Sequence, residues 1–338
     1  MNNVVVITGA SAGVGRATVR AFAAEGWDVG LIARGEAGLE GAADEVRAAG
    51  RRALAIPLDV ADAAGVEDAA ARIELELGPI DVWVNNAMES VFSPVTETSP
   101  AEYRRVTEVD YLGYVHGTLA ALRRMKPRDR GVIVQVGSAL AYRSIPLQSA
   151  YCASKHAIVG FTDSLRCELI HDGSHVRLTA VHMPALNTPQ FGWVRSRLPG
   201  AAQPVPPIFD PDVAARAIVF AAEHPRRELL VGFPTVLAVW GQRFLPGVLD
   251  WYLGKTGYAA QQTAEPARHE PDNLDVPQDA TADHGARGRF GRRSRLWAPQ
   301  LQLTMHRGLV ATAAGLVTGL LVLGSRIRRG GELPLQRR

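Results

Sequence analysis

The sequence predicts an α/β protein with a doubly wound parallel sheet, and three observations carry this prediction. Short apolar runs rich in β-branched residues alternate with longer Ala-rich amphipathic stretches through residues 4–232. Two of these runs, 80–86 and 131–138, are almost continuously apolar, as strands buried on both faces of a parallel sheet are. A glycine-rich turn at 8–15 joins the first run to the first amphipathic stretch. Such strand–helix alternation places helices on both faces of one sheet.

The order of elements follows from hydrophobic periodicity. We expect strands at 4–8, 28–33, 52–59, 80–86, 131–138, 175–183 and 228–232. We expect helices at 14–26, 36–49, 62–77, 100–126 and 210–224, and a further helix after the fifth strand. The helix at 210–224 has the clearest start, with Asp210 as N-cap and Pro211 at the first helical position.

Composition divides the chain into three parts. Residues 1–258 form the predicted catalytic domain, and 259–295 are polar, aperiodic and dotted with Pro and Gly, which predicts a flexible, solvated linker. The tail, 296–338, contains eighteen residues without a charge at 308–325. As a helix these would span about 27 Å at ~1.5 Å per residue, just short of a ~30 Å hydrocarbon core. We expect this tail to associate with a membrane; the alternatives are an interfacial helix or one docked on the domain's own apolar surface.

Charge and cysteine content exclude several classes. The net charge is +3 and no basic stripe interleaved with aromatic residues occurs in residues 1–250, which argues against nucleic-acid binding. Cys152 and Cys167 would lie about 22 Å apart on one helix, too far for a disulfide. With no secretory signal at the N-terminus, we expect a cytoplasmic catalytic domain. His171 and His175 have helical spacing but no evident third ligand, so no metal site is expected.

The glycine-rich turn TGASAGVG predicts a dinucleotide-binding site. Its glycines allow a tight turn and let a pyrophosphate approach the backbone, while the helix N-terminus offers N–H groups. The alternative is an ordinary glycine-rich strand–helix turn. The candidate phosphate-binding residues are Gly9, Ser11, Ala12, Gly13, Val14 and Gly15.

The end of the second strand predicts a preference for NADP(H) over NAD(H). An acid at this place would accept from the ribose diol and favour NAD, but Ala33 stands there and Arg34 follows. A guanidinium can pair with a 2′-phosphate bidentately, and Arg16 in the first helix could assist. The alternative is that Arg34 is a solvated loop residue.

Further candidates follow the third and fourth strands. Asp59 and Val60 could cap the adenine edge, and Asn86 follows the fourth strand. Open α/β sheets bind ligands at the carboxyl ends of their strands, which is where these residues are expected.

Ser138, Tyr151 and Lys155 are the candidate catalytic residues. Ser138 closes the fifth strand, and Tyr151 and Lys155 are four apart on the following helix, so they face one way. A phenol with a pKa of ~10 is a poor acid near neutrality, but a nearby ammonium lowers that pKa. Tyr151 could then exchange a proton with a carbonyl or alcohol oxygen, while Ser138 orients that oxygen. The alternative is one buried Tyr and one surface Lys on a helix.

Together these motifs resemble the short-chain dehydrogenase/reductase family, over roughly residues 1–235. The shared motifs are TGxxxGxG at 8–15, NNA at 85–87, Ser138, the YxxxK pair Tyr151 and Lys155, and a Pro-x-x-x-Thr turn at 184–188. The resemblance implies one Rossmann-type domain, NAD(P)(H) dependence and an alcohol/carbonyl substrate. It also implies that Thr188 holds the nicotinamide carboxamide, and that helices near 100–126 and 149–171 pair in a homodimer or homotetramer.

The sequence departs from the family pattern at several positions. Met88 replaces the last glycine of NNAG, and Ala185 replaces a glycine after the sixth strand. Asp110 stands where the family has an Asn that acts as a fourth catalytic residue. Asp keeps an acceptor but loses the amide donor, so Asp110 is a possible fourth member of the site.

We therefore expect an NADP(H)-dependent oxidoreductase acting on a small alcohol, ketone or aldehyde. Residues 187–209 are expected to cover the pocket, and Phe191, Trp193, Leu198 and Ile208 within them suggest an apolar substrate. The alternative from another class is a cofactor-binding sensor, or a membrane-tethered scaffold, that has lost turnover.

Overall fold

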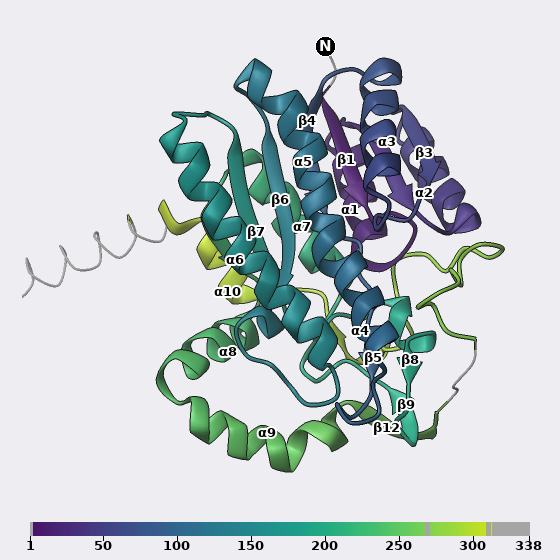
Figure 1. The fold of residues 1–338 in the computed structure, drawn as a ribbon, viewed down its shortest axis with the longest axis vertical. Helices are drawn as coiled ribbons and strands as arrows, with labels where there is room; N and C mark the ends of the chain where they lie inside the picture. The colour runs from purple at the N-terminus through teal and green to yellow at the C-terminus, as the bar shows by residue number, and fades with distance from the viewer. Residues whose placement is uncertain (1–2, 268–270, 309–311, 313–338) are drawn as a thin grey trace, which may run out of the picture. The chain divides into compact units, whose positions relative to one another are not determined.

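The computed structural model describes residues 3–267, 271–308 and 312. It divides into one compact unit, 1–298, and a second unit that begins at Pro299. The first unit is built on a seven-stranded sheet in the order β11-β7-β6-β4-β1-β2-β3, in which every pairing is parallel (Figure 1). The strands are β1 (Val4–Thr8), β2 (Asp28–Ala33), β3 (Ala53–Pro57), β4 (Ile80–Asn85), β6 (Val132–Ser138), β7 (Arg177–Met183) and β11 (Glu228–Leu230). The predicted doubly wound fold is confirmed.

The helices cover both faces of this sheet. They are α1 (Gly13–Ala24), α2 (Glu36–Ala48), α3 (Ala63–Glu76), α4 (Pro100–Thr107), α5 (Gly113–Met125), α6 (Ser149–His171) and α7 (Pro211–Glu223). α1 packs on α2 and α7, whereas α3 packs on α5 and α4 packs on α6. The helix predicted at 100–126 is interrupted by a π-helical turn, Glu108–Leu112. As predicted, Asp210 caps α7, accepting from the backbone N of Asp212 at 3.0 Å.

The central strands of the sheet are buried on both faces. Val4, Val5, Val6 and Ile7 of β1 are all fully buried, as is Trp83 on β4. Continuous apolar strands of this kind need a helix layer on each side, which α1 and α5 provide on adjacent parts of the sheet. The carboxyl ends of the strands then meet along one edge, where loops can form a site.

The region after β11 differs from the prediction. It forms α8 (Phe233–Phe244) and α9 (Pro246–Ala260), which were not predicted, and then β12 (Gln262–Pro266) and β13 (Ser294–Arg295). These short strands pair with β9 (Gly200–Ala202) and β10 (Ile208–Phe209) respectively, while β5 (Val91–Phe92) pairs with β8 (Arg195–Ser196).

Residues 259–295 were expected to be a solvated linker, but their described part belongs to the first compact unit, the one built on the sheet. Leu274, Ala286 and Phe290 are each at most 5% exposed. These apolar residues are too widely spaced to give a periodic signal, and the segment's polar side chains are used in ion pairs with the domain.

The predicted membrane-associated helix at 308–325 lies outside the described residues, apart from Gly308 and Thr312. In the second unit the structure describes α10 (Pro299–Met305). Among the residues that the structure describes, no helix has the length and apolar character needed to cross a membrane.

Candidate active site

A cleft of about 520 Å³ lies at the carboxyl ends of the strands. Volumes of this order are typical of small-molecule sites. It is lined by these predicted site residues: Gly9, Ser11, Ala12, Gly13, Val14, Arg34, Asp59, Val60, Asn86, Ser138, Tyr151, Lys155 and Thr188. Gly15 and Asp110 lie behind the lining. The sequence thus brings together nearly all of its candidates in one place.

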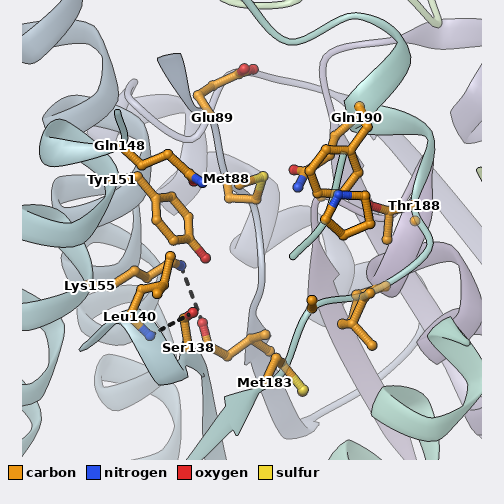
Figure 2. Close-up of a pocket in the computed structure, with 18 of the residues that line it drawn as sticks. Met88, Glu89, Ser138, Leu140, Gln148, Tyr151, Lys155, Met183, Thr188 and Gln190 are labelled. Carbon is orange, nitrogen blue, oxygen red and sulfur yellow. Dashed lines mark hydrogen bonds between the residues drawn. The ribbon is translucent and has the colours of Figure 1, made fainter. Parts of the chain in front are cut away.

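The candidate catalytic residues converge on one side of this cleft. Figure 2 shows Tyr151 and Lys155 on α6 facing Thr188 and Gln190 across the cleft, with Ser138 at its base. Ser138 Oγ accepts a hydrogen bond from the backbone N of Leu140 at 3.1 Å, which fixes the hydroxyl at the end of β6. The Tyr151 side chain lines the same space as Ser138. A substrate oxygen placed between these two hydroxyls would contact both.

Lys155 has hydrogen-bond partners on α5 and β6. Its Nζ donates to the hydroxyl of Tyr114 at 2.9 Å and to the carbonyl of Val136 at 3.3 Å. It lies 5.5 Å from the centre of the Tyr151 ring. Burial lowers the pKa of Lys155 to about 8, while the charge of Asp110 opposes this. The ammonium is therefore present at neutral pH but readily loses its proton.

In the protein alone, the pKa of Tyr151 is raised, whereas the sequence predicted that it would be lowered. Burial raises it, and the negative charge of Asp110 adds to this, whereas the nearby Ser138 hydroxyl opposes it. The direction is upward because a buried phenolate loses its hydration.

Asp110 lies in the π-helical turn and is fully buried. Its Oδ1 accepts from the backbone N of Glu89 at 2.6 Å, and its Oδ2 has no hydrogen-bond partner among the described residues. Burial raises the pKa of Asp110 to about 7, and the charge of Lys155 opposes this rise. π-helical turns inside α-helices are frequent at functional sites. Asp110 thus interacts with Lys155 from behind the cleft.

Two residues of this network were not predicted. Tyr114 lies one turn after Asp110 and donates to the Val136 carbonyl at 2.9 Å while accepting from Lys155. The i,i+4 spacing of Asp110 and Tyr114 was the available signal. Glu89 joins the two ends of the cleft, since its backbone contacts Asp110 and its carboxylate pairs with Arg34.

The glycine turn has the geometry that a phosphate needs. Gly9 and Gly13 have φ of +65° and +59°, which favour glycine. A Cβ on Gly15 would lie 1.9 Å from the Gly9 carbonyl oxygen and 2.7 Å from Asn86 Nδ2. Asn86 Nδ2 also donates to the Thr8 carbonyl at 2.9 Å, which fastens the turn to the end of β4. The turn therefore brings the N-terminus of α1 to the cleft without side chains of its own in the way, which fits a dinucleotide pyrophosphate, and the N–H of Gly13 there donates to the Gly285 carbonyl.

The other end of the cleft holds several ion pairs. Arg34 pairs with Glu89 and also donates to the carbonyl of Leu274 at 3.1 Å, so it is not a solvated loop residue. Burial raises the pKa of Glu89 to about 8, although Arg34 opposes this. Asp59 pairs with Arg105 at 2.6 Å, so its carboxylate is already engaged at the predicted adenine edge.

The residues expected to cover the pocket divide into two groups. Phe191 and Trp193 line the cleft. Leu198 and Ile208 are 3% and 1% exposed and pack in the interior instead. Phe191 contacts Phe290 edge-on at 6.1 Å between ring centroids, so the C-terminal segment supports this cover.

Comparison with known proteins identifies a matching family model and a similar oxidoreductase. Residues 3–198 match the family model described as short chain dehydrogenase. An uncharacterized oxidoreductase of Bacillus subtilis (strain 168), YxnA, is 32% identical over 326 residues, which cover 93% of this chain and 90% of the relative.

Two solved structures are also similar. The alcohol dehydrogenase from the archaeon Thermococcus sibiricus, complexed with 5-hydroxy-NADP, has a TM-score of 0.60 and 29% identity, covering 68% of this chain and 96% of that one. A short-chain dehydrogenase from Streptomyces avermitilis has a TM-score of 0.62 and 30% identity, covering 77% of this chain and 97% of that one.

The fold, the cleft and these relatives define an oxidoreductase that uses a nicotinamide cofactor. The chain belongs to the short-chain dehydrogenase family.

Proposed function

We propose that this protein transfers a hydride between NADP(H) and the alcohol or carbonyl carbon of a small apolar molecule, with Tyr151 as general acid and base. The convergence of Ser138, Tyr151 and Lys155 beside the glycine turn carries this proposal. Apolar side chains around the same space, among them Met88, Met183 and Phe191, support an apolar substrate.

The chain's own residues would hold the substrate oxygen and move its proton. When bound, the nicotinamide supplies or accepts the hydride. The Ser138 and Tyr151 hydroxyls would hydrogen-bond the substrate oxygen, and Tyr151 would donate its proton to that oxygen in reduction and take one back in oxidation. Lys155, whose pKa is about 8, provides a positive charge that stabilises the phenolate as it forms. Asp110 would balance that charge from behind.

The preference for NADP(H) rests on the ribose end of the cleft. Ala33 leaves no acid at the end of β2, and Arg34 and Arg16 bring two guanidinium groups to this region. Guanidinium groups bind phosphate strongly and bidentately. The similar protein complexed with 5-hydroxy-NADP supports the same cofactor here.

The test is a panel of aldehydes and ketones incubated with the purified full chain and NADPH or NADH, following cofactor oxidation by absorbance. We expect turnover with apolar carbonyl compounds and faster turnover with NADPH at limiting cofactor. Cofactor binding without turnover on any substrate would instead support the sensor alternative.

Two features of the whole protein stay proposals. We propose that the tail at 308–325 associates with a membrane and that α5 and α6 pair between copies of the chain. Carbonate-wash fractionation of the full chain against a chain ending at Ala298 tests the first. That boundary keeps the first unit whole, including β13. Sedimentation of the shortened chain tests the second.

A further inference from the structure

Part of the presumed linker lies at the adenosine end of the cleft. We call residues 271–290 the strap. Three of its residues, Asn273, Pro277 and Asp279, line the cleft together with Arg34 and Asp59. In Figure 1 it belongs to the yellow-green loops beside α2. A bound dinucleotide would therefore contact the strap.

The strap backbone occupies amide donors that a phosphate would use. At the start of α2, the N–H of Gly38 donates to the Asp279 carbonyl at 3.1 Å, and that of Ala37 donates to the Ala280 carbonyl at 3.3 Å. In the glycine turn, the N–H of Gly13 donates to the Gly285 carbonyl at 3.1 Å. First-turn amides of a helix have no partner within the helix and readily bind anions, so the strap takes the place of an anion here.

The carboxylate of Asp279 lies directly against the start of α2. Asp279 is only 6% exposed. A Cβ on Gly35 would come 1.8 Å from Asp279 Oδ1, and one on Gly38 would come 2.8 Å from Oδ2. The absence of side chains at Gly35 and Gly38 therefore makes room for this carboxylate, immediately after Arg34.

A second strap acid neutralises Arg16. Asp283 pairs with the buried Arg16 guanidinium at 3.0 Å, and Glu45 pairs with it from the other side at 2.8 Å. A Cβ on Gly41 would lie 2.2 Å from Asp283 Oδ2. Glycines at 35, 38 and 41 thus leave one face of the α2 region open to both strap acids.

We propose that Asp279 and Asp283 are specificity-determining residues that lower the affinity of the cleft for a 2′-phosphate. The carboxylate of Asp283 pairs with the Arg16 guanidinium, and that of Asp279 lies against Gly35 and Gly38 at the start of α2, so both negative charges would repel such a phosphate. A ribose 2′-hydroxyl carries no charge and does not need the contacts between the strap and α2 to be broken. The strap therefore opposes the NADP(H) preference that Arg34 creates, and a 2′-phosphate must move the strap away from α2. The inference rests on the proposed function because it takes the cleft as the dinucleotide site.

The test compares adenosine 2′,5′-bisphosphate with 5′-AMP, two probes that differ only in the 2′-phosphate. Their dissociation constants are measured by calorimetry with the full chain and with Asp279→Asn and Asp283→Asn. We expect each substitution to tighten binding of the bisphosphate about ten-fold while leaving 5′-AMP unchanged, because a like charge beside the ligand is removed. The matched control is Asp275→Asn: this strap carboxylate is exposed and pairs with Arg195, so both constants should stay as in the wild type.

A measurement on the unaltered chain guards against variants that fold poorly. Saturating bisphosphate should raise amide hydrogen exchange across 271–290, whereas saturating 5′-AMP should not. Equal changes for both probes in the variants, or no change for either, would overturn the role of the strap acids. Protection of the strap by the bisphosphate would overturn it too. If neither probe binds the wild type, the proposed function itself fails.

Discussion

The two ends of the cleft are built in different ways. At the nicotinamide end, Ser138, Tyr151 and Lys155 come from β6 and α6, one strand and the helix that follows it. At the adenosine end, Arg16 meets Asp283, which is 267 residues further along the chain. The first end is held by local geometry, whereas the second exists only when distant segments have packed together.

The charges of the two ends differ as well. Among the candidate catalytic residues, burial lowers the pKa of Lys155 to about 8, and behind them burial raises the pKa of Asp110 to about 7, so both can exchange protons near neutral pH. At the adenosine end, Arg16 forms ion pairs with two carboxylates. Burial lowers its pKa, but the hydrogen bonds to Glu45 and Asp283 outweigh this and leave the pKa raised. Lys155 and Asp110 are therefore suited to proton transfer at one end, whereas Arg16 keeps a fixed positive charge at the other end, where Glu89 is a group that can titrate.

The largest expected effect is a loss of turnover from a change at the nicotinamide end alone. Tyr151→Phe removes the proton that the mechanism transfers but little volume. Turnover should fall by about 10²–10⁴-fold, while the dissociation constant for NADPH stays nearly unchanged. Tyr142→Phe is the control, because the Tyr142 hydroxyl pairs with Glu228 outside the cleft. Retention of most of the wild-type turnover by the Tyr151 variant would refute the mechanism.

The next effect concerns the adenosine end. Arg34→Ala should weaken NADPH roughly ten- to hundred-fold more than NADH, since a hydrogen bond to a charged group contributes about 1.5–3 kcal/mol. Fluorescence titration with both cofactors measures this. Arg47→Ala, an exposed arginine of α2 paired with Glu40 and Asp44, should change neither constant. Equal losses for both cofactors would show that Arg34 does not distinguish them.

A smaller expected effect tests how the strap packs against the start of α2. Gly35→Ala should push Asp279 away from α2 at a cost of about 1–3 kcal/mol, because the new methyl group overlaps the carboxylate. Limited proteolysis should then cut within 271–290 sooner than in the wild type, with turnover at saturating cofactor little changed. At Gly160 a Cβ meets nothing within 4 Å, so Gly160→Ala is the control. An unchanged cleavage pattern at Gly35→Ala would contradict the described packing.

The smallest expected effect is on the slope with which the free energy of unfolding changes with pH. Burial raises the pKa of Asp110 from 3.8 to about 7, so the folded state binds a proton more tightly than the unfolded state does. The free energy of unfolding should therefore fall as pH rises from about 4 to about 7. Asp110→Asn should flatten part of this decline in urea titrations at several pH values, leaving the part due to Glu89. Asp250→Asn, at an exposed carboxylate, is the control. An identical slope in Asp110→Asn would show that Asp110 is already ionised at low pH.

Sequence patterns predicted the sheet and the nicotinamide end because both depend on short-range signals. Apolar runs marked β1 and β4, and the spacing of Tyr151 and Lys155 placed them on one helical face. The conformation of Gly9 and Gly13 follows from the same kind of local constraint.

The same patterns missed contacts whose cause lies far away in the chain. Asp279 has no local feature that predicts burial, and its environment is the space left by Gly35 and Gly38. The π-helical turn at Asp110 was missed because its residues continue a helical pattern on both sides. Helix α9 was missed because it is apolar on most faces, with Trp251 exposed, and gives little amphipathic signal.

Synthesis of the chain from its N-terminus gives the strap a further consequence. The glycine turn, α2 and the helix carrying Tyr151 and Lys155 all leave the ribosome before residues 271–290 do. Until then the start of α2 has neither Asp279 nor Asp283 beside it, and its first amides are open to solvent or to a nucleotide. The part that closes the adenosine end is therefore made late, followed in the sheet unit only by residues 291–298, and a nucleotide that arrives before it would meet a wider site than one that arrives afterwards.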